Sequence, residues 1–406
     1  MEAGSRFGAR QMAGFKDFYQ SANATRVIAG RDLLSSTGFE LTKEGAHRVL
    51  LVTDQVIRGT GLVDRVVAGV EDGGPVVAGV FDDVPQDSST EVCERCAEEA
   101  RAAGADSFLA VGGGSVMDTA KIAAALFTHG GTAAECEGFF LMPRADDGVG
   151  APLPIAPLVC IPTTCGTGSE VSMGAVVKDH ERKVKLEIAD FPLFPRLAIL
   201  DPESTRTLPA RIAAATAMDA MTHAIEGYVS VEWNPHQDGR SLVALRLIRD
   251  NLERAIERPE DEQARGNLLI AASLAISIAL GATHSMSHPC GAHYGVPHGV
   301  ANAINMPHVI RFNAEGGSDI ADRYRDLNRV FGLEAGGPDD QVGDALATYV
   351  EAMVEGLGLP TRLAHVGVPK AGIPALVEGA MGDGLTLLNP RELTEADYEE
   401  LYRRAL

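Results

Sequence analysis

Histidine residues cluster in the stretch 281–302, GATHSMSHPCGAHYGVPHGVAN, which holds four of the chain's 11 histidines. Packing explains such a cluster poorly, because a buried imidazole loses hydration and needs partners for both ring nitrogens. His284 and His288 are four residues apart, so on a helix they project from one face. The proline and glycine residues between 289 and 297 predict that the chain then leaves the helix and loops back with His298. This arrangement predicts several ligands gathered around one metal ion.

A carboxylate that could complete this site lies in the segment AATAMDAMTHAIEGY. Asp219 and His223 are four residues apart on a strongly helical pattern, so they share one face. Their neighbours are mostly small or apolar, which predicts a buried helix on which an aspartate needs a strong partner. With His284 and His298 they give one carboxylate and three imidazoles, a ligand set suited to Fe²⁺ or Zn²⁺. The alternative is a surface contact between Asp219 and His223.

His288 is left without a ligand role in this scheme. One helical turn from His284, it could relay a proton between an alcohol on the metal and solvent. His293 and His308 have no assigned task, and we interpret them as structural or surface residues.

Three consecutive glycines at 112–114 precede Ser115, after one strand pattern and before a helical one. Glycine lets a ligand approach the backbone, and the free N–H groups at a helix start attract a phosphate. Ser115 and Asp118 also fit a capping pair, so a capped helix after a tight turn is the alternative. Three glycines exceed what a cap requires, and the loop therefore predicts a pyrophosphate site.

Further nucleotide contacts are predicted at the ends of other strands. Asp54 ends the strand pattern RVLLVT, where a carboxylate can bind an adenosine ribose and repel a 2′-phosphate, favouring NAD over NADP. It could equally be a turn residue. The loop 162–170, PTTCGTGSE, is rich in threonine and glycine, which suits either a nucleotide or a plain turn. Lys185 is predicted near the same sheet end, unless it is only a solvated strand residue.

These candidate residues require elements that bring strand ends together. Apolar runs alternate with helical patterns, one following Asp54 to about residue 70 and another at 90–103. The alternation predicts an open, mostly parallel α/β sheet. Two runs at 173–178 and 183–188, joined by a polar turn, predict a β-hairpin. The runs expected in the sheet are 26–29, 48–53, 76–81, 107–111, 158–161 and 198–200.

The pattern changes at Thr207, which can cap a helix with Pro209 in its first turn. Long helical segments then follow at 211–228, 239–256 and 262–280. We therefore predict an α/β dinucleotide-binding domain over 1–206 and an all-helical metal-binding domain over 207–406. About the first 20 residues are predicted to form a loose arm.

The composition of the chain argues against some classes of binding partner. A net charge of −21 argues against nucleic acid and against anionic membrane surfaces, both of which need concentrated positive charge. Cys93 and Cys96 form a CxxC without a second one, so we interpret them as ordinary helix cysteines. The scattered cysteines, the absence of a signal-peptide pattern and the lack of an apolar run long enough for a membrane predict a cytoplasmic protein.

Taken together, the motifs GGGSVMDTAK, PTTCGTGSE, AMDAMTHAIEGY and THSMSHPCGAHYGVPHGVANAI resemble the iron-containing (group III) alcohol dehydrogenase family. The resemblance covers nearly the whole chain, including LDPESTRTLP before the helical region and the terminal NPRELTEADYEELYRRAL. It implies an N-terminal nucleotide-binding domain, a C-terminal helical domain and NAD(P) in the cleft between them. It also implies a homodimer or a larger homo-oligomer.

The resemblance assigns roles residue by residue. His288 takes the position of an additional histidine near the substrate. The metal-ligand positions fall on Asp219, His223, His284 and His298. The cofactor positions fall on Gly113, Gly114, Ser115, Asp118, Thr163, Thr164, Thr167 and Lys185.

Some positions depart from the family pattern. Asp87 and Ser88 stand where many relatives have Asn-Pro after the third strand. Gly174 and Ala275 stand where some relatives carry larger side chains near the substrate. The small side chains at positions 174 and 275 predict a substrate pocket larger than a short-chain alcohol requires.

The expected function is that of a metal-dependent, NAD-linked alcohol dehydrogenase or aldehyde reductase acting on a small molecule. The ion, Fe²⁺ or alternatively Zn²⁺ or another divalent metal, polarises the substrate oxygen while hydride passes to or from nicotinamide C4. One alternative is a hydroxyacid–oxoacid transhydrogenase that retains NAD. Maleylacetate-type reductases of the wider superfamily lack the full set of metal ligands, so the four candidate ligands here count against that class. A non-catalytic nucleotide- or metal-binding protein would not need His288 beside the ligands.

Overall fold

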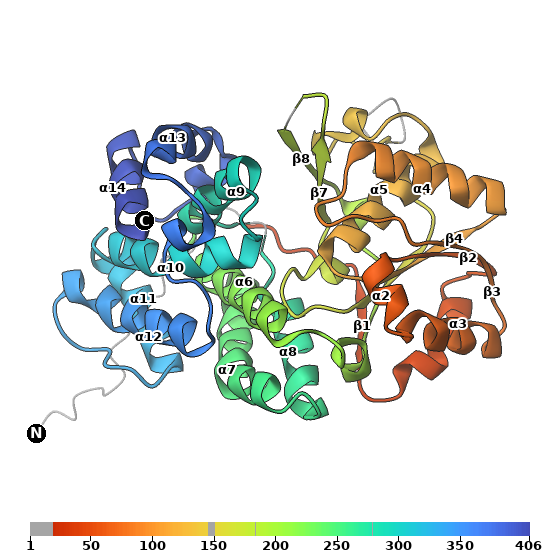
Figure 1. The fold of residues 1–406 in the computed structure, drawn as a ribbon, viewed down its shortest axis with the longest axis horizontal. Coiled ribbons are helices and arrows are strands. Elements are labelled where there is room, and N and C mark those ends of the chain that lie inside the picture. The colour runs from red at the N-terminus through yellow and green to blue at the C-terminus, as the bar shows by residue number, and fades with distance from the viewer. Residues whose placement is uncertain (1–18, 145–150, 183, 278) are drawn as a thin grey trace, which may run out of the picture.

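The computed structural model describes residues 19–144, 151–182, 184–277 and 279–406. An α/β half and an all-helical half lie side by side (Figure 1). The predicted loose arm lies almost entirely outside the described residues, as does Lys183 at the start of one predicted hairpin strand.

Among the residues that the structure describes, all strands belong to the first half of the chain. They are β1 (Arg26–Ala29), β2 (Arg48–Val52), β3 (Val76–Phe81), β4 (Ser107–Gly112), β5 (Gly138–Phe139), β6 (Leu158–Pro162), β7 (Gly174–Asp179), β8 (Val184–Ala189) and β9 (Leu197–Leu200). Its α-helices are α1 (Thr37–Lys43), α2 (Gln55–Gly59), α3 (Leu62–Asp72), α4 (Thr90–Ala103) and α5 (Gly114–His129).

The second half contains helices and connecting turns. Its α-helices are α6 (Ala210–Val229), α7 (Pro235–Glu257), α8 (Glu262–Ala275), α9 (Ala282–Tyr294), α10 (His298–Ala314), α11 (Ser318–Val330), α12 (Val342–Gly356), α13 (Ile373–Gly382) and α14 (Glu395–Ala405).

The main sheet has the order β1-β9-β6-β4-β2-β3 among the described residues, and every pairing is parallel. Residues alternate between its two faces. Leu50 and Val52 join the apolar cluster beneath α4 and α5, whereas Val49 and Leu51 join the cluster beneath α3. A strand covered on both faces must be apolar at every position, as the run VLLV is. The predicted fold class is confirmed.

The predicted hairpin is present one residue later than expected, as β7 and β8. It belongs to a separate small sheet in the order β5-β8-β7, where β5 adds a short parallel pairing. Leu186 and Ile188 point into the core, so Lys185 and Glu187 lie on the opposite face of β8. The hairpin lies at the border with the helical half (Figure 1).

Helix α6 is at the centre of the helical half and contacts α7, α8, α10 and α11. Every residue of α6 from Ala217 onward is buried and most are small or apolar, which lets neighbouring helices pack closely. Asp219 and His223 are therefore carried inside the molecule, as the apolar flanks predicted.

Several predicted boundaries were wrong. The helical pattern from 54 to about 70 is two helices, broken before Gly61, which has a φ of 77°. Thr207 does not cap a helix. Pro209 occupies the position before α6, which starts at Ala210.

The predicted helix at 262–280 ends at Ala275, because Ile276 turns to extended backbone and packs against Gly168. Apolar periodicity could not show this end, because Ala279 after the break is buried as well.

The expected loop after 289 was also wrong. Helix α9 continues through Pro289 to Tyr294 and ends at Gly295, whose φ is 65°. The proline ring packs against Gly379 of α13, where a β-carbon would lie 2.8 Å from Pro289 Cβ. This packing offsets the lost backbone hydrogen bond.

Two charged residues are buried where the loop 162–170 meets α5. Lys121 is fully buried, and its Nζ donates to Ser169 Oγ, Ser172 Oγ and the carbonyl of Gly174. Glu170, in a short 3-10 helix (Ser169–Val171), is 2% exposed. Burial raises the pKa of Glu170 from 4.5 to about 7, with Lys121 opposing the change only in part.

Glu170 makes the stability of the fold depend on pH. Its folded-state pKa lies above the unfolded value, so its burial costs little below pH 4.5 and more as pH rises to 7. For Glu170→Gln we expect a flatter dependence, with a relative gain of up to about 3 kcal/mol in the free energy of unfolding at pH 8. Chemical denaturation at pH 5, 6, 7 and 8 measures this. Equal slopes for the wild type and the variant would contradict it, and the exposed Glu98→Gln serves as control.

Candidate metal and cofactor site

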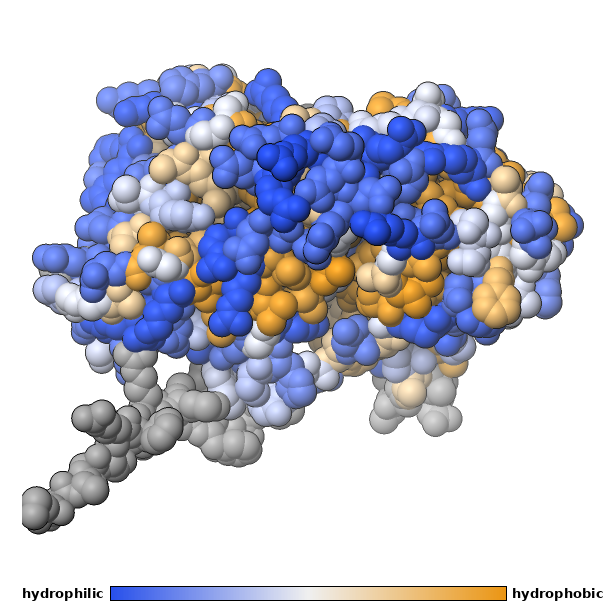
Figure 2. Space-filling model, turned by 90° about the horizontal axis from the view of Figure 1, so that it is seen from below, coloured by the Kyte–Doolittle hydropathy of each residue, from blue (hydrophilic) through white to orange (hydrophobic). Residues whose placement is uncertain are grey.

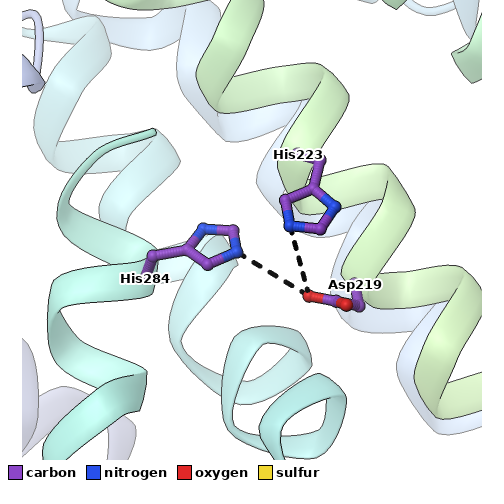
Figure 3. Close-up of side chains that lie close together, drawn as sticks. All are labelled: Asp219, His223 and His284. Carbon is purple, nitrogen blue, oxygen red and sulfur yellow. Dashed lines mark ion pairs between the residues drawn. The ribbon is translucent and has the colours of Figure 1, made fainter. Parts of the chain in front are cut away.

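Three imidazole nitrogens converge on one carboxylate oxygen in the helical half. The Oδ1 atom of Asp219 lies 3.4 Å from His298 Nε2, 3.7 Å from His284 Nε2 and 3.9 Å from His223 Nε2. Asp219 and His223 come from one face of α6, and His284 reaches them from α9 (Figure 3). His298 is the first residue of α10. The structure thus brings together all four residues that the sequence predicted as ligands.

The protonation states suit metal binding. Burial by itself would raise the pKa of Asp219, but His223, His298 and His284 hold it well below its usual range, so the carboxylate is charged. Loss of hydration, opposed in part by Asp219, lowers the pKa of His223 to about 4 and that of His298 to about 3. Both rings are therefore neutral at pH 7 and present lone pairs.

A second carboxylate orients His284. Its Nδ1 lies 2.6 Å from Glu226 Oε2, and the same carboxylate accepts the backbone N–H groups of Gly281 and Thr283. Burial opposes protonation of His284, but Glu226 and Asp219 outweigh it and raise its pKa to about 9. At pH 7 the free ring therefore carries a proton on each nitrogen; Glu226 would retain the Nδ1 proton, and a metal would displace the Nε2 proton that faces Asp219.

Asn302 completes the surroundings from α10. Its Nδ2 lies 2.8 Å from Asp219 Oδ1 and 3.2–3.3 Å from the Nε2 atoms of His298 and His284. One ligating atom each of Asp219, His223 and His284 lies within 4.8 Å of the other two, and His298 approaches the same carboxylate from outside this group. One carboxylate with three imidazoles fits a divalent transition metal such as Fe²⁺ or Zn²⁺.

His288 lies beside this set without pointing at Asp219. Its ring stacks on that of His298 at a centroid distance of 5.4 Å, and its Nδ1 lies 2.7 Å from Asp383 Oδ2. Asp383 is the residue after α13. With Nδ1–H donated to this carboxylate, Nε2 is the nitrogen free to exchange a proton. His293, one turn further along α9, is exposed.

The glycine loop packs closely against the threonine-rich loop in the other half. Strand β4 ends at Gly112 and α5 begins at Gly114. A β-carbon on Gly113 would lie 3.3 Å from Thr164 Cγ2, and one on Gly114 would lie 2.8 Å from Thr167 Cγ2. Thr163 N donates to the carbonyl of Gly112 at 3.0 Å. The two predicted nucleotide loops therefore form one surface at the carboxyl ends of β4 and β6.

Ser115 and Asp118 do not form the capping pair considered as an alternative, because α5 has no side-chain cap. Ser115 Oγ accepts the backbone N–H of Asp87 at 3.0 Å. The Nζ atom of Lys185 lies 3.5 Å from Asp87 Oδ1, which places it on the same side as Ser115. Asp118 instead accepts from Ser169 Oγ at 2.6 Å and from the β7 backbone, and so ties α5 to the hairpin.

Asp54 caps a helix in the structure. Its Oδ1 accepts the N–H of Ile57 at 2.8 Å. For this oxygen, the alternative that Asp54 is a turn residue is therefore correct. Asp54 also lies at the carboxyl end of β2, the strand next to β4. A contact between Asp54 and the ribose therefore stays a prediction.

Sequence reasoning missed Glu226, Asn302 and Asp383, and also Glu187, a ligating atom of which lies within 4.8 Å of one each of His288 and Asp383. The first was accessible, because Glu226 lies seven residues after Asp219 on the same buried helix face. Asn302 was accessible as well, because it lies four residues after His298 on α10. Asp383 and Glu187 depend on contacts between distant segments. Asp383 is 95 residues from His288 and belongs to a connection whose sequence gives no sign of a site.

The fold and site belong to a known class. Residues 24–202 match the family model described as iron-containing alcohol dehydrogenase, and residues 213–406 match the C-terminal model of the Fe-containing alcohol dehydrogenase family. The chain is a member of the iron-containing alcohol dehydrogenase family.

Individual relatives agree with this assignment. The chain is 37% identical to a 4-hydroxybutyrate dehydrogenase of Cupriavidus necator over 379 residues, covering 90% of this chain and 94% of the relative. It is 33% identical to an NAD-dependent methanol dehydrogenase of Bacillus methanolicus, with 93% and 97% covered. A crystal structure of a 1,3-propanediol oxidoreductase superposes with a TM-score of 0.89 at 30% identity, with 96% and 100% covered.

These relatives confirm the predicted family and enzyme class, which is that of oxidoreductases acting on CH–OH groups. They also support the prediction of NAD and iron as cofactors. In the part of the chain that the structure describes, no helix combines the length and apolar character needed to cross a membrane.

Glu226 should control metal affinity through His284. In Glu226→Gln the carboxylate that holds His284 Nδ1–H is lost while side-chain size is kept. We expect the affinity for Zn²⁺ to fall by roughly 10–100-fold, measured by competition with a chelating dye. The exposed Glu232→Gln is the matched control. Wild-type affinity in a folded Glu226→Gln protein would show that this contact does not support the site.

Proposed function

We propose that this protein is a metal-dependent, NAD-linked alcohol dehydrogenase or aldehyde reductase that acts on a small primary alcohol or aldehyde. The observation that carries the proposal is the convergence of His223, His284 and His298 on one oxygen of Asp219. A purely structural role does not explain three imidazoles facing a buried carboxylate, and the adjacent His288–Asp383 pair supplies proton transfer. When bound, the metal supplies Lewis-acid polarisation of the substrate oxygen, and NAD supplies the hydride acceptor.

The residues of this chain hold and move the proton. His288 Nε2 accepts the proton of the substrate hydroxyl and passes it to solvent, since the ring is 24% exposed. Asp383 holds His288 Nδ1–H and fixes the tautomer that leaves Nε2 free. In the reverse direction the same nitrogen returns a proton to the product alcohol.

The loops of the α/β half bind the cofactor in this proposal. Gly113 and Gly114 at the start of α5 present backbone N–H groups to the pyrophosphate. Ser115, Thr163, Thr164 and Thr167 surround the same strand ends. Lys185 offers a positive charge on the hairpin, and Asp54 offers an acceptor at the end of β2. We assign Asp118 to the cofactor site as well, through its support of the hairpin.

We also infer the broader organisation. The two domains divide at 206, between the last strand and α6, which supports a nucleotide domain of 1–206 and a catalytic domain of 207–406. Exposed apolar side chains such as Phe139, Leu141 and Leu387 support a homo-oligomer, and Figure 2 shows hydrophobic areas on one face. Six free cysteines support a reducing, cytoplasmic location.

The test uses protein purified without oxygen, with its metal content measured. We expect NADH to accumulate, as followed by absorbance, when NAD and a panel of primary alcohols are added to metal-loaded protein. Chelated protein should produce none. Full activity without metal would overturn the proposal. Turnover only when an alcohol and a second carbonyl substrate are both present would instead indicate a transhydrogenase.

Substitution separates the ligands from the proton-handling residue. His284→Ala and His298→Ala should lose metal and activity together, because each removes one imidazole from the set. His288→Ala should keep its metal but turn over about 10²-fold more slowly or worse, because it lacks only the proton acceptor. Metal analysis beside steady-state rates distinguishes the two results. Loss of metal in His288→Ala would refute the division of roles.

A further inference from the structure

Glu187 carries a carboxylate to the candidate site from the other half of the molecule. One ligating atom each of Glu187, His288 and Asp383 lies within 4.8 Å of the other two. Glu187 belongs to β8, whereas His288 and Asp383 belong to the helical half. The proton-handling pair therefore has a second carboxylate facing it from the hairpin.

The strand explains why Glu187 points there. Side chains alternate along β8, and Leu186 and Ile188 are buried in the core of the α/β half. Lys185 and Glu187 consequently share the face directed away from that core. Lys185 lies beside Asp87, whose backbone N–H donates to Ser115 at the cofactor loops. Glu187 lies beside His288. Glu187 therefore lies next to the proton acceptor, two residues along the same strand face from the lysine at the cofactor loops.

The Glu187 carboxylate has capacity for a ligand. It is half-buried, and among the described residues it makes no hydrogen bond, whereas Asp383 is paired with His288 and accepts Leu385 N. Burial raises the pKa of Glu187, with His288 opposing this change. A half-buried acceptor without a partner gains from a hydrogen-bond donor supplied by a bound molecule.

We propose that Glu187 selects the substrate class: it accepts a hydrogen bond from a hydroxyl group at the end of the substrate remote from the reacting carbon and disfavours a carboxylate there. The substrates are then diols or hydroxyaldehydes in preference to hydroxyacids. The selection has two parts. A terminal hydroxyl donates to the Glu187 carboxylate, whereas a terminal carboxylate meets Glu187 and Asp383 and has no proton to donate. This inference rests on the proposed function.

The experiment compares three alcohols of equal chain length: 1,4-butanediol, 4-hydroxybutyrate and 1-butanol. Values of kcat/KM are measured with NAD and metal-loaded wild type, Glu187→Gln and Glu187→Ala. Glu181→Gln, an exposed change of the same charge in the turn of the same hairpin, is the control. The ratio of two substrates within one variant cancels any general effect of a substitution on metal, cofactor or His288.

We expect the wild type and Glu181→Gln to prefer the diol over the hydroxyacid. In Glu187→Gln the ratio of diol to hydroxyacid should fall by about tenfold, mainly through better use of the hydroxyacid, and in Glu187→Ala it should fall by at least as much. Relative to 1-butanol, the diol should lose its advantage in Glu187→Ala.

An unchanged ratio in both Glu187 variants, with alcohols still oxidised, would overturn the role of Glu187 while leaving the proposed function intact. A wild type that prefers 4-hydroxybutyrate would also overturn it. No oxidation of any of the three alcohols by the metal-loaded wild type would instead count against the proposed function itself.

Discussion

The buried charge of Asp219 is the constraint on which the helical half depends. A carboxylate removed from water is costly unless opposite charge or hydrogen bonds replace its hydration. Here Asn302 of α10 donates to the carboxylate at 2.8 Å, and the charged His284 ring faces it from α9. The rings of His223 on α6 and His298 at the start of α10 surround the same oxygen. Glu226 then fixes His284. A bound divalent ion would neutralise this acidic centre, so folding and metal binding are coupled.

Glycines let both the α/β half and the start of α10 pack closely against the helix that carries Asp219. A β-carbon on Gly166 would lie 2.6 Å from the carbonyl oxygen of Thr216, and one on Gly299 would lie 2.1 Å from that of Ala215. Both contacts involve α6, one turn before Asp219. The loop 162–170 and the start of α10 are therefore held directly against the helix that carries the ligands. Close backbone contact makes the spacing between the cofactor loops and Asp219 insensitive to side-chain motion.

Much of this organisation could be predicted from the sequence, because local patterns encode it. Apolar runs such as VLLV require cover on both faces, and Asp219 with His223 on an apolar helix requires a buried partner. Patterns failed where tertiary contact decided the outcome. Pro289 was expected to end a helix that packing against Gly379 preserves, and α8 ends at Ala275 where Ile276 meets a loop about one hundred residues earlier.

The same distinction applies to the site. Residues on one helix, or in one loop after a strand, could be grouped by spacing alone. Asp383 and Glu187 could not, because His288 meets them only after two distant segments fold against α9. Their carboxylates nevertheless set how His288 is oriented and what can approach it. Spacing along the chain thus predicted the residues that converge on Asp219, whereas the side chains that surround them required the folded structure.

Anomalous diffraction from crystals loaded with Fe²⁺ or Zn²⁺ tests the central claim most directly. The account predicts one strong peak about 2.0–2.2 Å from Asp219 Oδ1 and from the Nε2 atoms of His223, His284 and His298. The three Nε2 atoms lie 3.4–3.9 Å from Asp219 Oδ1 in this structure, so small side-chain shifts suffice to place all four atoms around a central ion. A principal peak among Glu187, His288 and Asp383 instead, with none at Asp219, would contradict it.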